Sequence, residues 1–183
     1  MNPQLGPMPD LDTLIGLFYD APEQLGQFDE AASSELPEPY AVLLDHNEHM
    51  TVTVESFHRS RVDVQVLETN ITPTHYARKI LLTRQSDGGV VQFGVVRLNM
   101  GYLSEPVQRE IRSQQKPLGR ILIEHHVLRQ VELVGLWRVT CGPDLQKYFG
   151  LNGPTATYGR TALIHCNGEP AVELLEIVTP CTS

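Results

Sequence analysis

Glu176 is the side chain whose chemistry stands out most against its sequence context. It lies in Ala171–Thr179, which is apolar on both faces of an expected strand. Such a strand is usually central and buried, and a buried carboxylate must be paired, hydrogen-bonded or protonated because desolvation disfavours its charged form. Glu176 is therefore either half of a structural ion pair or a functional acid. Glu173, on the opposite face, is the weaker candidate.

Arg78 has a similar setting in Tyr76–Arg84, a strand-like segment rich in Ile and Leu. Its planar guanidinium matches a carboxylate through two parallel hydrogen bonds, so Arg78 could anchor a carboxylate ligand. The sequence leaves open that it pairs with Glu176 or another acid instead. Arg97 and Arg129 also lie on strand segments, and either could add a second carboxylate contact or extend its charged end into water.

The turn Pro117-Leu118-Gly119 lies between two expected helical segments. Backbone N–H groups at such a turn are free to donate to a carboxylate. Most turns of this composition have no such role, so the segment alone is weak evidence for a binding site.

Other common reaction centres are not indicated. His46 and His49 are spaced for one helix face, but no Cys, Asp or third His follows at a matching interval, so we expect no metal. Neither a Gly-rich phosphate loop nor a Gly-x-Ser-x-Gly motif occurs. The three cysteines fit neither a metal motif nor a disulfide framework, and we expect reduced thiols at Cys141, Cys166 and Cys181.

The bulk composition is that of one globular domain. The chain has 183 residues, of which 41% are hydrophobic and 20% charged, and no apolar run is long enough to span a membrane. The N-terminus lacks a basic region followed by an apolar stretch, so we expect a cytoplasmic protein. A net charge of −8 without a Lys/Arg block argues against nucleic acid as a partner, but one local arginine pocket could still hold a small anion.

The pattern of elements predicts an α+β fold. Residues 1–36 form a Pro-rich, acidic leader with a short helix over Leu11–Tyr19, and residues 37–183 form the main domain. Alternating segments predict strands at 51–57, 62–67, 76–84, 90–98, 127–139, 157–165 and 171–179, and helical patterns lie at 40–46, 104–113 and 142–149. We therefore expect a single antiparallel β-sheet with helices packed on one side.

Six short segments, in this order and spacing, resemble the chorismate pyruvate-lyase (4-hydroxybenzoate synthase) family, and its divergent prokaryotic branch most of all: Met50-Thr51, Arg78 within 75–82, Gly94, 116–120, Gly168-Glu169-Pro170, and Glu176 ahead of Pro180. The resemblance implies a chorismate lyase-like α+β domain with an enclosed site roofed by flap segments. It also implies a carbon–oxygen lyase that removes pyruvate from chorismate, with neither metal nor organic cofactor.

The resemblance also assigns roles to individual residues. Arg78 would hold the ring carboxylate, and the backbone at Leu118 would contact the same region. Glu176 would meet the ring oxygen at the reacting end, so Glu176 and Arg78 are the expected catalytic residues. Met50 would line the pocket from a flap, and Arg129 would match an arginine found in some relatives.

Two alternatives to this lyase remain. The same fold resembles the effector-binding domain of GntR-type repressors, so the chain could be a non-catalytic module that binds a small acid. It could also be a lyase for another enolpyruvyl or hydroxy-aromatic acid. In each case we expect a small-molecule ligand, no nucleic acid or membrane partner, and a monomer.

Overall fold

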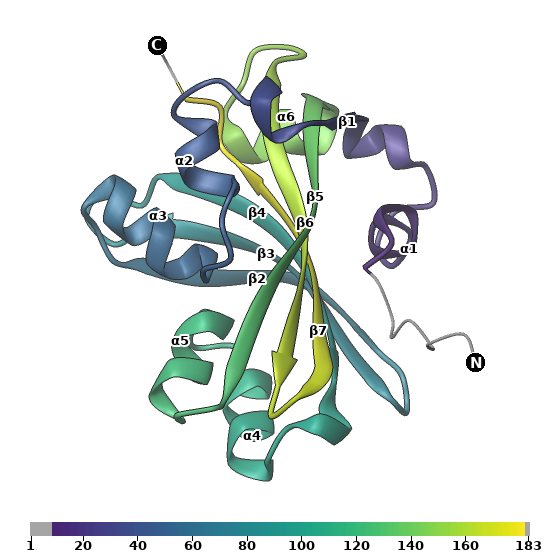
Figure 1. The fold of residues 1–183 in the computed structure, drawn as a ribbon. Coiled ribbons are helices and arrows are strands. Elements are labelled where there is room, and N and C mark those ends of the chain that lie inside the picture. The colour runs from purple at the N-terminus through teal and green to yellow at the C-terminus, as the bar shows by residue number, and fades with distance from the viewer. Residues whose placement is uncertain (1–8, 182–183) are drawn as a thin grey trace.

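Seven antiparallel strands form one strongly twisted sheet in the computed structural model, which describes residues 9–181 (Figure 1). The spatial order is β1-β5-β6-β7-β4-β3-β2, so β7 lies at the centre. The strands are β1 (Gly26–Ala31), β2 (Val62–Ile71), β3 (His75–Arg84), β4 (Val90–Asn99), β5 (Arg129–Cys141), β6 (Ala156–Cys166) and β7 (Glu169–Val178). The predicted fold class is confirmed, and the chain has a chorismate lyase-like fold.

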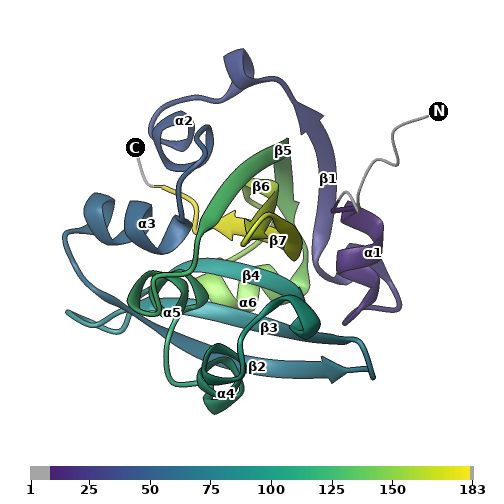
Figure 2. The ribbon, with the colours of Figure 1, turned by 60° about the horizontal axis from the view of Figure 1, so that its bottom comes forward.

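Most helices lie on one face of the sheet (Figure 2). That face carries α2 (Tyr40–Leu44), α3 (Met50–His58), α4 (Glu105–Ser113) and α5 (Leu118–Glu124). Two short helices, α1 (Leu11–Gly16) and α6 (Pro143–Phe149), pack on the other face. Short 3₁₀ turns occur at Pro22–Gln24, Ser33–Glu35 and Met100–Tyr102.

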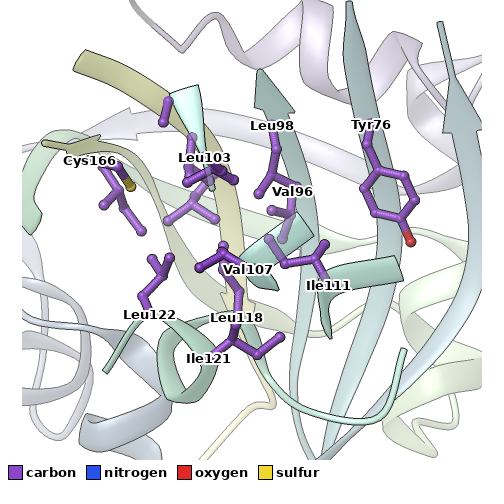
Figure 3. Packing of buried hydrophobic residues seen from close by; sticks show 14 of the residues in the cluster. Tyr76, Val96, Leu98, Leu103, Val107, Ile111, Leu118, Ile121, Leu122 and Cys166 are labelled. Carbon is purple, nitrogen blue, oxygen red and sulfur yellow. The ribbon is translucent and has the colours of Figure 1, made fainter. Parts of the chain in front are cut away.

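The two-residue period of the central strands separates the core into layers. In β7, Leu174 and Glu176 face α2–α5, whereas Leu175 and Ile177 face α1 and α6. Figure 3 shows the first layer, in which side chains of α4 and α5 meet Val96 and Leu98 of β4. Burial on both faces explains why the sequence of β7 is almost continuously apolar.

The segment 51–57 is helical, although its alternating residues predicted a strand. It forms most of α3, which ends at Arg59 in the left-handed conformation with φ of 50°. The buried side chains of α3 are Met50, Thr51 and Val54, a spacing that places them on one helix face. Seven residues are too few for the two periods to be separated by pattern alone, and packing against the rest of the domain decides the outcome.

The first 36 residues contribute more structure than the predicted short helix. α1 begins at Leu11 as expected and contacts β4 and β7. β1 was not predicted because its sequence is mostly polar, yet it pairs with β5 along its whole length. The division of the chain at residue 36 into leader and domain stays a prediction. Within residues 9–181, no helix is long and apolar enough to cross a membrane.

The central strand should be far more sensitive to truncation than the sheet edge. Ile177 is 0% exposed in β7, and Ile71 at the end of edge strand β2 is 70% exposed. We expect Ile177→Ala to lower the free energy of unfolding by about 2–5 kcal/mol because it leaves a cavity. Ile71→Ala is the matched control, with an expected change within about 0.5 kcal/mol. Urea denaturation measures both, and similar losses would contradict this layering.

Candidate functional site

A cavity lies between the sheet and helices α3 and α5, and four of the five predicted site residues line it. Arg78 of β3 and Glu176 of β7 form part of its floor, and Met50 and Leu118 close it from the first residues of α3 and α5. Its volume is about 40 Å³, which corresponds to roughly three water molecules. The structure therefore brings together residues that are up to 126 positions apart in the sequence (176 − 50).

Arg129, the fifth predicted residue, does not line the cavity. Its Nε donates to Nε2 of His49 at 2.7 Å, and its Nη1 donates to the carbonyl of Val127 at 3.3 Å. Arg129 instead lines a surface groove that shares His49 and Val131 with the cavity. Its contact with the cavity is thus indirect, through the His49 ring.

Arg78 is a buried cation for which residues 9–181 provide no counter-ion. Its side chain is 1% exposed, and within residues 9–181 neither Nε nor Nη1 finds a hydrogen-bond acceptor. Burial lowers the pKa of Arg78, an effect that the nearby Tyr76 opposes, but a guanidinium remains protonated in proteins. The Tyr76 hydroxyl is also buried without a partner in this part of the chain. Such groups are costly when left unsatisfied.

Glu176 is paired with Arg160, a residue that sequence reasoning missed. Nε of Arg160 donates to Oε2 of Glu176 at 2.8 Å. The two residues face each other across the β6–β7 ladder, and Gly94 lies on the other side of Glu176 in β4. The available signal was the one used for Arg78, because Arg160 is also a charged residue within an apolar strand.

Arg160 also fixes the loop 45–49, which connects α2 to α3. Its Nη1 donates to the carbonyl of His46 at 2.9 Å, and its Nη2 donates to the carbonyl of Glu48 at 2.9 Å. The Arg160 side chain is 0% exposed, so these bonds are shielded from water. One side chain thus links the sheet, the acid Glu176 and the chain that leads into Met50.

The ring of His49 is neutral in this arrangement. Its Nε2 accepts from Arg129, which requires that this nitrogen carry no proton. Burial, together with the charges of Arg129 and Arg160, lowers the pKa of His49 to about 4. The pKa of His46 is also lowered, by burial and by the charge of Arg160.

Gln92 is a further buried polar residue that the sequence did not single out. It lies in β4, two residues before Gly94, and its side chain lines the cavity at 2% exposure. Its Oε1 has no hydrogen-bond donor among residues 9–181. A Gln in a strand is unremarkable in sequence, and only its burial gives it meaning.

Metal binding and thiol chemistry gain no support at this site. Within residues 9–181, no three His, Cys, Asp or Glu residues gather as potential metal ligands. Burial raises the pKa of Cys141 and of Cys166 to about 11, so both thiols are protonated at neutral pH and are poor nucleophiles.

Comparison with solved structures relates the fold to ligand-binding domains of regulators. PhnF from Mycobacterium smegmatis is 10% identical over 72% of this chain and 63% of that chain, with a TM-score of 0.50. Its effector domain alone is 10% identical over 72% and 88%, with a TM-score of 0.51. The ligand-binding domain of a protein described as a GntR-family transcriptional regulator from Bordetella bronchiseptica is 12% identical over 64% and 85%, with a TM-score of 0.50.

At these identities the likeness shows the fold alone, and the chain spans less than two thirds of the PhnF chain. Neither a family model nor a curated protein matches the sequence.

The prediction of a carbon–oxygen lyase is wrong. Two of the similar solved structures are described as an effector domain and as the ligand-binding domain of a GntR-family transcriptional regulator, and neither is a lyase. Glu176, expected to act at the reacting end, is held by Arg160 as half of a buried ion pair.

Arg160 should be the most stability-critical charged residue of the site. Arg160→Met leaves Glu176 buried without its counter-ion, so we expect the free energy of unfolding to fall by about 3–5 kcal/mol. Adding Glu176→Met should recover much of this loss because the uncompensated charge is then gone. Urea denaturation provides the measurement, with the exposed Arg138 replaced by Met as the control. A double variant as unstable as the sum of its single variants would contradict the pairing.

Acid should destabilise the protein through His49. Its pKa is about 4 in the folded state and 6.5 as the ordinary value, so between these pH values the unfolded chain binds a proton that the folded chain does not. The free energy of unfolding should therefore fall as pH drops from 6.5 to 4, by at most about 3 kcal/mol from this group. His49→Gln keeps an acceptor for Arg129 but cannot titrate, so its stability should depend less on pH over this range. Identical pH profiles would contradict the assignment.

Proposed function

We propose that this chain is a non-catalytic module that binds a small organic acid, with Arg78 holding the carboxylate. The observation that carries the proposal is the unpaired guanidinium of Arg78 in the wall of a buried cavity. A carboxylate placed there would receive hydrogen bonds from Nε and Nη1 and would neutralise the buried charge.

Four other buried or partly buried bases each have an acidic partner, which Arg78 lacks among residues 9–181. Ion pairs join Lys79 to Glu68, Arg97 to Glu173, Arg120 to Glu55 and Arg160 to Glu176. The fold thus supplies an acid for each of these four bases. Arg78 and Arg160 both line the cavity, and both are almost fully buried. Arg160 is paired with Glu176, and we infer that the counter-ion of Arg78 is a ligand.

The walls of the cavity favour an organic acid over an inorganic anion. The side chains around Arg78 include Ile80, Val96, Leu118 and Leu174, which offer apolar contact but no further charge. Carboxylate and phosphate share the geometry that a guanidinium recognises, but only a ligand with an apolar body gains from these walls. The small volume limits that body to a short chain or a single ring.

The fold comparison supports the same function. Two of the similar structures are described as an effector domain and a ligand-binding domain. Ligand or effector binding is therefore the use of this architecture that those proteins' descriptions name, and binding of a small acid is the alternative that the sequence left open.

Replacing Arg78 should remove binding and stabilise the empty protein. Calorimetric titration with benzoate is expected to show binding to the wild type, weakened about 10- to 100-fold in Arg78→Met, which loses charge-assisted hydrogen bonds. Because Arg78→Met also removes an unpaired buried charge, the free energy of unfolding of the ligand-free protein should rise by about 1–3 kcal/mol. Arg138→Met is the control for both measurements.

Two further titrants separate the chemical classes. Benzamide has the ring without the charge and should not bind measurably, and inorganic phosphate should bind more weakly than benzoate. Phosphate binding stronger than benzoate would replace the organic acid with a phosphate ligand. An Arg78→Met protein that binds benzoate as the wild type does, or that loses stability, would contradict the proposal.

A further inference from the structure

Two cavity-lining residues carry buried polar atoms that lack a partner within residues 9–181. They are Arg78, with Nε and Nη1, and Gln92, with Oε1. The first group donates hydrogen bonds and the second accepts them. A ligand that satisfies Arg78 alone would leave the amide of Gln92 desolvated, which has its own cost.

The two groups stand at opposite ends of the cavity floor. Arg78 is opposite Val96 in the β3–β4 ladder, and Gln92 lies four residues before Val96 on the same face of β4. Four residues correspond to about 13 Å along a strand. Gly94 lies midway, and a Cβ there would approach the Ile80 side chain to 3.3 Å. The Ile80 side chain therefore lies over Gly94, between the two polar ends of the floor.

Glu176 adds a second acceptor in the middle of the floor. It is opposite Gly94 in the β4–β7 ladder. Arg160 binds its Oε2, and the carboxylate lines the cavity. Because Arg160 already balances the charge of Glu176, this part of the cavity calls for a hydrogen-bond donor and not for a cation.

We propose that the acid bound by Arg78 carries a neutral hydrogen-bond donor, a hydroxyl or an N–H group, at the end remote from its carboxylate. Gln92 accepts this hydrogen bond through Oε1, whereas Glu176 lies in the middle of the floor and is already charge-balanced by Arg160. Gln92 is then the residue that selects among acids of similar size. This inference rests on the proposed function, because Arg78 fixes which end of the ligand faces Gln92.

The test compares ligands that differ only in the remote group. Benzoate, 3-hydroxybenzoate, 4-hydroxybenzoate and 4-methoxybenzoate are titrated into the wild type by calorimetry. At least one hydroxybenzoate is expected to bind about fivefold to tenfold more tightly than benzoate, as one added hydrogen bond allows. The methoxy compound accepts but does not donate, so it should gain nothing over benzoate.

Substitution of Gln92 should remove this preference selectively. In Gln92→Leu, the ratio of hydroxybenzoate to benzoate affinity should fall to within about twofold of unity, since the acceptor is gone. Gln65→Leu is the matched control, because Gln65 is exposed on β2, and it should keep the wild-type ratio. Should Gln92→Leu not fold, the comparison of hydroxyl with methoxy compounds in the wild type decides alone.

The outcomes separate this inference from the proposed function. Arg78-dependent binding with equal affinities for benzoate and both hydroxybenzoates would overturn the donor requirement and leave acid binding intact. A hydroxyl preference that persists in a folded Gln92→Leu protein would overturn the role of Gln92. Absence of Arg78-dependent binding for all four compounds would overturn both proposals together.

Discussion

The ion pair between Arg160 and Glu176 is the interaction on which the candidate site depends. Both residues are buried near the middle of the sheet, where neither charge could be tolerated alone. Arg160 uses its two remaining nitrogens on the carbonyls of His46 and Glu48. The chain that enters α3 is therefore held against the sheet by the same group that neutralises the acid, and Met50 is positioned as a consequence.

The contrast between two buried arginines on one sheet face gives the cavity its electrostatic character. The charge of Arg160 is balanced by Glu176. All three of its side-chain nitrogens donate hydrogen bonds, one to Glu176 in β7 and two to carbonyls of the loop 45–49. Arg78 is equally enclosed but unbalanced. The cavity therefore holds one uncompensated positive charge within apolar walls, where an opposite charge interacts strongly. The proposed binding of an acid rests on this imbalance more directly than on any single contact.

Local patterns in the sequence predicted most strands of the sheet and some of the residues that line the cavity. Alternation located most strands, and Asp87-Gly88 marked the β3–β4 hairpin, where Gly88 has a φ of 73°. Charged residues within apolar strands pointed to Arg78 and Glu176. The burial of Gln92 and the pairing of Glu176 with Arg160 were not predicted because both depend on strand order. The strands β6, β7 and β4 become neighbours only in three dimensions. The strand β1 was missed because its polar residues carry no pattern that separates an edge strand from a loop.

The failure of the lyase prediction has a physical cause. The resemblance placed an arginine and a glutamate at the two ends of a ligand site, and the structure does bring both to one cavity. A carboxylate anchor, however, serves binding and catalysis equally, so Arg78 could not separate them. The discriminating group is the acid, and its state depends on a partner that no motif included. Once Arg160 holds Glu176 as a charge-balanced acceptor, Arg78 and Glu176 together fit the proposed binding of a polar molecule.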